Sequence, residues 1–198
     1  MNLEFNDMSS DDFDRCKEIF LNNLVVTDEQ RARIERDTVG QLTNNLWKQY
    51  KSQRLTTSYF GRVCKLRSVD SRPRCVENIL YDTFHGDPNT RYGINKEKIA
   101  RLQVEKNLGK QIHLSGLFIH ITLHYLGASP DGLVDGVDGD SILEITCPSS
   151  IQEYTPRAAF ENRKLKFMTV NNEGQLVLKE EDERYYQVQG QFNISEET

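Results

Sequence analysis

The chain has 198 residues, of which 37% are hydrophobic and 28% are charged, and its formal net charge is −5. This composition is typical of one globular domain with a substantial core, and it excludes a largely disordered chain. The longest apolar run, residues 116–119, is far too short to cross a bilayer, and the polar residues after Met1 do not resemble a secretory signal peptide.

The cysteines indicate a reducing environment. No two of the four have the close spacing of a zinc ribbon or of a thioredoxin-like motif. They are Cys16, Cys64, Cys75 and Cys147. Scattered cysteines of this kind are typical of intracellular proteins, so we expect a protein of the nucleus or cytoplasm that is not secreted.

Positive charge is concentrated between residues 38 and 69, where no Asp or Glu occurs. The basic residues of this segment are Lys48, Lys51, Arg54, Arg62, Lys65 and Arg67. An all-basic segment in an acidic chain can attract phosphates locally. A solvated helix face followed by a loop explains the same pattern equally well.

The first half of the chain is predicted to be helical. Residues 1–26 are interpreted as an N-terminal leader or a short helix. The capping box Thr27–Gln30 predicts a helix over 28–52, bent near Gly40. Further helices are predicted over 57–66, 76–84 and 91–107, and Gly109 ends the last of them.

The second half is predicted to contain strands followed by one helix. Strand-like runs cover 111–115, 117–123 and 125–133, and Asp135-Gly and Asp138-Gly supply turn chemistry before a return strand over 141–146. A second hairpin is predicted over 165–179 and a helix over 180–194. This order of elements favours an α/β or α+β fold with a mixed sheet.

The first hairpin brings together residues that can bind a metal. It places Asp131, in a Pro-Asp-Gly turn, beside the strand that carries Glu144 and Thr146 on one face. Two neighbouring carboxylates repel each other unless a cation joins them, and Mg²⁺ is a natural partner. Glu97, on a partly apolar helix stripe, is a candidate third carboxylate. A plain structural turn remains an alternative, whereas the acidic stretch lacks EF-hand spacing.

Four segments resemble the YqaJ-type viral recombinase and phage lambda exonuclease family of PD-(D/E)xK nucleases. "GASPDGLV…ILEITCP" (127–134 and 142–148) resembles the nuclease core of that family. "WKQYKSQRLTTSYFG" (47–61), "YGINKEKIAR" (92–101) and "YYQVQGQF" (185–192) resemble three further family motifs in the same order. The similarity extends from about residue 27 to 194.

The resemblance implies a fold and an activity. It implies a restriction-endonuclease-like core, a mixed central sheet flanked by helices, over 27–198, with an N-terminal helical extension. The implied activity is an Mg²⁺-dependent nuclease, with Mn²⁺ as a substitute, that acts as an exonuclease on double-stranded DNA ends in recombination or repair. A homotrimer is also implied. The family usually continues beyond the Gln-rich helix, so the chain is expected to be short at its C-terminus.

The resemblance also assigns roles to individual residues. The implied metal ligands are Glu97, Asp131, Glu144 and the carbonyl of Ile145. The implied contacts to DNA or phosphate are Lys51, Arg54, Ser58 and Gln189. Gln187 is implied to position the attacking water or the DNA backbone.

Thr146 departs from the family pattern, which has a lysine at this position. A threonine hydroxyl supplies no positive charge near the attacking water, and loss of such a group typically lowers the rate by about 10²–10⁴-fold. Lys98, Lys164 and Lys166 are candidates to replace it. The alternative function is therefore a catalytically weakened or inactive nuclease-fold protein that binds DNA. An interaction domain with a structural acidic loop is a third hypothesis.

Overall fold

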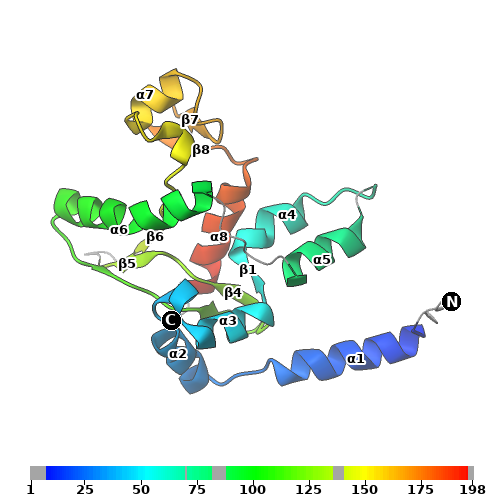
Figure 1. Ribbon diagram of the computed structural model, residues 1–198. Helices are drawn as coiled ribbons and strands as arrows, with labels where there is room; N and C mark the ends of the chain where they lie inside the picture. Colours follow the sequence, from blue (N-terminus) through cyan, green and yellow to red (C-terminus); the bar gives the residue numbers. More distant parts are fainter. Residues whose placement is uncertain (1–7, 70, 82–87, 136–140, 196–198) are drawn as a thin grey trace.

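The computed structural model describes residues 8–69, 71–81, 88–135 and 141–195, which form helices around small β-sheets (Figure 1). The α-helices are α1 (Ser10–Asn23), α2 (Asp28–Asp37), α3 (Asn45–Ser52), α4 (Phe60–Cys64), α5 (Arg72–Tyr81), α6 (Pro88–Leu108), α7 (Pro156–Glu161) and α8 (Glu183–Ser195). The short 3₁₀ helices are η1 (Gln41–Thr43), η2 (Thr57–Tyr59) and η3 (Ser149–Ile151). Within these ranges, no helix combines the length and the apolar character that a membrane span requires.

The strands form three small sheets. They are β1 (Leu55–Thr56), β2 (Ile112–His113), β3 (Phe118–Ile119), β4 (Leu126–Ala128), β5 (Gly132–Val134), β6 (Ser141–Leu143), β7 (Met168–Val170) and β8 (Leu176–Leu178). One sheet has the order β1-β4-β3, with β1 parallel to β4, and a second has the order β2-β5-β6. The β7–β8 pair is the predicted second hairpin. The predicted α/β fold with a mixed sheet and flanking helices is confirmed, and the mixed sheet is β1-β4-β3.

Strand β3 separates two apolar clusters because its side chains alternate between the two faces of the sheet. The cluster toward α2 and α3 contains Ile34, Trp47, Leu117 and Ile119. The cluster toward α8 contains Phe118, Ala128 and Ile194. Because each face of this sheet packs against helices, the β1-β4-β3 sheet is a fixed support for the β5–β6 hairpin that follows it.

Helix α2 approaches the chain before β3 very closely. A Cβ atom on Gly116 would lie 1.8 Å from the carbonyl oxygen of Glu35, so only glycine fits at this position. The buried Thr38 hydroxyl donates to the Ile34 carbonyl at 2.6 Å and accepts from the Leu117 N–H at 2.7 Å. These contacts attach the C-terminal end of α2 to the sheet.

The predicted helix over 28–52 is two helices, because the chain turns sharply between them. The predicted capping box at the start of α2 is present. Gly40 has a φ of 94°, a left-handed conformation that ends the helix instead of bending it. The Asn44 side chain then accepts from the Leu46 and Trp47 N–H groups and starts α3.

Other boundaries also differ from the sequence prediction. Helix α5 begins at Arg72 rather than at 76, because Pro73 lies in its first turn, where no backbone donor is lost. Residues 82–84 of that predicted helix, and the turn residues 136–140, lie outside the described residues. The predicted helix over 57–66 is η2 followed by α4, which ends at Cys64.

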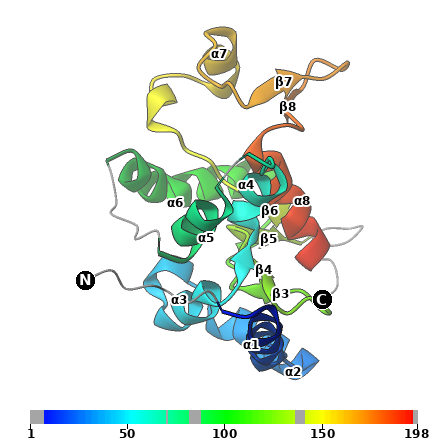
Figure 2. The same ribbon diagram turned by 90° about the vertical axis from the view of Figure 1, so that its right-hand side faces the viewer.

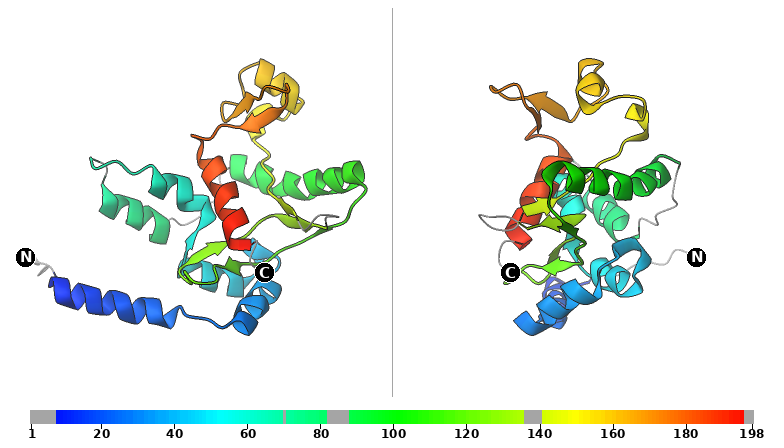
Figure 3. Two further views of the ribbon diagram at one scale, coloured as in Figure 1. Left: turned by 180° about the vertical axis from the view of Figure 1, so that it is seen from behind. Right: turned by 90° about the vertical axis from the view of Figure 1, so that its left-hand side faces the viewer.

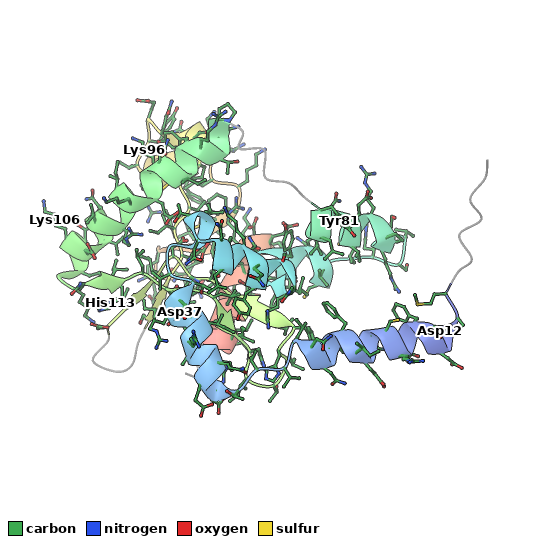
Figure 4. All side chains as sticks on the ribbon, turned by 60° about the horizontal axis from the view of Figure 1, so that its bottom comes forward. Asp12, Asp37, Tyr81, Lys96, Lys106 and His113 are labelled. Atoms are coloured by element: carbon green, nitrogen blue, oxygen red, sulfur yellow. The ribbon has the colours of Figure 1, made fainter. Side chains whose placement is uncertain are left out.

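Two parts of the chain project from the body. Helix α1 has no buried residue and extends away from the rest, as Figure 4 shows for the helix that carries Asp12. On the opposite side, α7 and the β7–β8 hairpin form a separate lobe (Figure 2). Helices α6 and α8 lie between this lobe and the sheets (Figure 3). The predicted N-terminal helical extension is present.

Candidate active site

The β5–β6 hairpin brings Asp131 beside Glu144. Gly132 pairs with Leu143, and the Asp131 N–H donates to the Leu143 carbonyl at 2.9 Å. The Ile145 N–H then donates to Asp131 Oδ2 at 2.7 Å. Because this N–H bonds to a side chain, it is not available for strand pairing, and β6 ends at Leu143 instead of continuing to Thr146 as predicted.

Two glutamines of α8 hold the Glu144 carboxylate. Gln187 Nε2 donates to Glu144 Oε1 and Gln191 Nε2 donates to Glu144 Oε2, each at 2.7 Å. Gln187 was predicted at this site, whereas Gln191 was not. The missed signal is the i, i+4 spacing, which places both side chains on one helix face. Gln189 is exposed, and the structure does not bring it to Glu144.

Burial and mutual repulsion disfavour ionisation of both hairpin carboxyls. Burial raises the pKa of Asp131 to about 6, and the charge of Glu97 adds to this, while the Ile145 N–H and Arg101 oppose it. Burial also raises the pKa of Glu144 to about 7, and the charges of Asp131 and Glu97 add to this. The three predicted carboxylates are therefore close enough to influence one another.

The three carboxylates do not form a closed metal cluster by themselves. Among the described residues, no group of three or more His, Cys, Asp or Glu side chains is placed to hold an ion. Mg²⁺, however, commonly uses one or two carboxylates and keeps several waters. Asp131 and Glu144 fit this requirement, because burial and nearby negative charge raise the pKa values of both carboxyls, and a cation between them would favour their ionised forms.

Glu97 lies between two openings next to the hairpin. A cleft of about 640 Å³ is lined by Glu97, Ile145 and Thr146, together with other residues of α6 and with Arg184. A smaller cavity of about 220 Å³ is lined by Glu97, Asp131 and Arg101. Glu97, Asp131 and Ile145 therefore border space that is large enough for water and for a phosphate group, whereas Glu144 lines neither opening.

A third cleft contains part of the basic segment. It has a volume of about 590 Å³ and is lined by Lys48, Lys51 and Thr56, among others. Lys51 Nζ lies 4.5 Å from the centroid of the Trp47 ring, and burial lowers the pKa of this lysine. Ser58 is exposed, and its Oγ lies 3.1 Å from Thr56 Oγ1.

Arg54, a predicted phosphate contact, lines the same cleft, but its guanidinium also makes contacts within the protein. Its side chain is buried, and its Nε donates to the His124 carbonyl at 2.9 Å. The other two guanidinium nitrogens donate to the carbonyls of Tyr50 and Leu24. Arg54 therefore joins three segments of the protein at the wall of this cleft, and its contact with phosphate stays a prediction.

Comparison with known proteins identifies the family. The model of the YqaJ-like viral recombinase domain matches residues 46–197. The chain is similar in fold to an alkaline exonuclease from Laribacter hongkongensis, with 23% identity and a TM-score of 0.54 over 76% of this chain and 68% of that chain. The same exonuclease in complex with dAMP gives a TM-score of 0.52 and 23% identity, over 75% and 69% of the two chains. No curated protein matches the sequence. The chain belongs to the YqaJ-like viral recombinase domain family.

Proposed function

We propose that this chain is an Mg²⁺-dependent nuclease that hydrolyses phosphodiester bonds at the ends of double-stranded DNA, in recombination or repair. The observation that carries the proposal is the pair of carboxyls Asp131 and Glu144, which the β5–β6 hairpin places side by side and whose pKa values are raised, chiefly by burial. Membership of the YqaJ-like family and the fold of an alkaline exonuclease support the same activity.

Asp131, Glu144 and the carbonyl of Ile145 would hold the metal, which Mn²⁺ can replace, and Glu97 would reach the same site from α6. Mg²⁺ bound there would lower the pKa of a bound water and stabilise negative charge on the phosphate. Gln187 and Gln191 hold both oxygens of Glu144, so they fix the direction in which this carboxylate presents its lone pairs.

The DNA end would lie along the cleft that Lys48 and Lys51 line. Lysine side chains bind phosphates as point charges, and both lysines of this cleft belong to the all-basic segment 38–69. Ser58 and Gln189, which are both exposed, would contact the DNA backbone beside this cleft. The family resemblance adds a homotrimer that encircles DNA as the proposed assembly.

Cleavage of a labelled, 5′-phosphorylated linear duplex tests this function. We expect Mg²⁺ or Mn²⁺ to support cleavage, EDTA to stop it, and a closed circular duplex to resist it. Asp131→Asn and Glu144→Gln should each lower the rate by at least about 10²-fold. Asp135→Asn changes an exposed carboxylate of the same hairpin and serves as the matched control. If both site variants cleave like the wild type, the proposed site is wrong.

One observation favours the second candidate function, a weakened nuclease-fold protein that binds DNA. Thr146 lines the cleft beside Glu97 where the family pattern has a lysine. If the wild type binds the duplex but cleaves it slowly, and Thr146→Lys raises the rate by about 10²-fold or more, the second candidate is correct.

A further inference from the structure

The acidic site contains a cation that the sequence did not predict. Arg101 lies on α6 one turn after Glu97, and its Nη1 is 3.8 Å from Glu97 Oε1. In Figure 4, Lys96 and Lys106 mark the parts of α6 on either side of these two residues. The spacing i, i+4 places Glu97 and Arg101 on the same face of the helix.

The position of Arg101 favours an electrostatic role. Its side chain is only 14% exposed, and it lines the 220 Å³ cavity together with Glu97 and Asp131. The distance of 3.8 Å to Glu97 exceeds a hydrogen bond, so this pair is an electrostatic contact. The charge of Arg101 also reaches the hairpin, since it opposes the rise in the pKa of Asp131.

The other candidate cations are less well placed. Lys164 and Lys166 are exposed and belong to the segment between α7 and β7, in the lobe that projects from the body (Figure 2). Lys98 lines the 220 Å³ cavity, but it is exposed to solvent, which weakens its charge interactions with Asp131. Arg184 lines the larger cleft, but its guanidinium pairs with Asp182 at 3.1 Å and covers the Phe167 ring at 4.1 Å.

We infer that Arg101 supplies the positive charge of the acidic site that the family lysine would supply at position 146. This inference rests on the proposed function. Arginine remains charged even when it is largely buried, so it can balance Glu97 and Asp131 and stabilise charge that develops on a phosphate. Because α6 carries both Glu97 and Arg101, one helix places an acid and the compensating cation at the site.

Two measurements on the same variants test the inference. Arg101→Gln should lower Mg²⁺-dependent cleavage of the linear duplex by at least about 10²-fold. The same variant should bind Mn²⁺ about threefold more tightly or better in calorimetry, because a positive charge beside the acidic site has been removed. Arg101→Lys should keep the cleavage rate within about tenfold. A purely structural role would not raise metal affinity.

A rescue experiment separates charge from packing. Adding Thr146→Lys to Arg101→Gln should restore most of the lost rate, because it returns one positive charge to the site. Arg101→Met keeps the aliphatic part of the side chain and should behave like Arg101→Gln. If one of these two neutral variants does not fold, the other serves for the same measurements. Lys106→Gln, on the same helix, is the matched control and should change neither cleavage nor Mn²⁺ affinity.

The outcomes also distinguish this inference from the proposed function. If the wild type cleaves and both neutral variants cleave equally fast, the inference is wrong and the function stands. If Lys98→Gln loses activity and Arg101→Gln does not, Lys98 supplies the charge and the inference is wrong. If no protein cleaves but the neutral variants bind Mn²⁺ more tightly, the proposed function fails while the electrostatic role of Arg101 stands. Unchanged Mn²⁺ affinity overturns that role.

Discussion

Replacing Asp131 with asparagine should make the metal-free protein more stable at neutral pH. The folded state raises the pKa of this carboxyl from 3.8 to about 6, chiefly through burial. The folded state therefore binds the proton more tightly than the unfolded state does. As the pH rises from about 4 to 6, Asp131 ionises in the unfolded chain but stays largely protonated in the folded protein. The free energy of unfolding therefore decreases over this pH range.

The size of the effect follows from the same two pKa values. A difference of one pKa unit corresponds to about 1.4 kcal/mol, so ionisation of Asp131 costs the folded wild type about 3 kcal/mol at pH 7.5. At pH 4 the cost is small, because this pH is close to the pKa of the unfolded carboxyl. Asparagine does not ionise, and its side-chain oxygen can still accept the Ile145 N–H. Asp131→Asn should therefore gain up to about 3 kcal/mol at pH 7.5 and very little at pH 4.

Thermal unfolding in EDTA at the two pH values measures this gain, which corresponds to a rise in Tm of about 6–12 °C at pH 7.5. Saturating Mg²⁺ should reduce or reverse the difference, because the variant lacks a proposed metal ligand. Asp135→Asn, on the exposed end of the same hairpin, should change Tm little at either pH. A variant that is no more stable than the wild type at pH 7.5 in EDTA would refute the reasoning.

Two further predictions concern buried positions. Gln191→Leu removes the hydrogen bond to Glu144, but it also removes a buried Oε1 that has no hydrogen-bond partner among the described residues. Because these two effects oppose each other, the free energy of unfolding in EDTA should change by less than about 1 kcal/mol, while cleavage falls at least about tenfold. A loss of more than about 3 kcal/mol in chemical denaturation would contradict this. Gly116→Ala should destabilise the protein by more than about 3 kcal/mol, because its Cβ would lie 1.8 Å from the Glu35 carbonyl oxygen. Gly93→Ala is the control and should be tolerated in the same assay, because its Cβ would lie 3.6 Å from its nearest neighbour.

The hairpins were predictable because their signals are local. Turn residues and alternating apolar residues identified both hairpins, and the register of the first one placed Asp131 beside Glu144 as expected. The capping box at Thr27 is also a local signal, and it is present. The break at Gly40 was less clear, because α2 and α3 form one periodic pattern and only their packing on β3 requires a turn between them.

The glutamines of α8 show what a sequence motif leaves open about a site. The family motif directed attention to Gln187 and Gln189, which are two residues apart. Side chains two positions apart on a helix point in different directions, whereas positions four apart share a face. Helical phase therefore selects Gln191, together with Gln187, as the partner of Glu144. To predict both partners of Glu144, one must know that this segment is helical and which face of the helix packs against the hairpin.

Arg54 shows the corresponding limit for charge patterns. A count of basic residues treats all six cations of the segment 38–69 as equivalent. The structure separates them, because Arg54 donates to three carbonyls whereas Lys51 lies over the Trp47 ring, although both residues line the same cleft. The carbonyls belong to residues far from one another in the sequence, so no local pattern could identify this buried role.

The departure at Thr146 has a structural counterpart in the end of β6. In the family pattern, the lysine follows the Glu by two residues, so a continuous strand would present both on one face. Here the Asp131 carboxylate binds the Ile145 N–H, and β6 ends at Leu143. A side chain at position 146 is thus no longer held by strand pairing. The position of a cation on the 21-residue helix α6 does not depend on that pairing, and Arg101 on this helix lies 3.8 Å from Glu97 with its side chain largely buried.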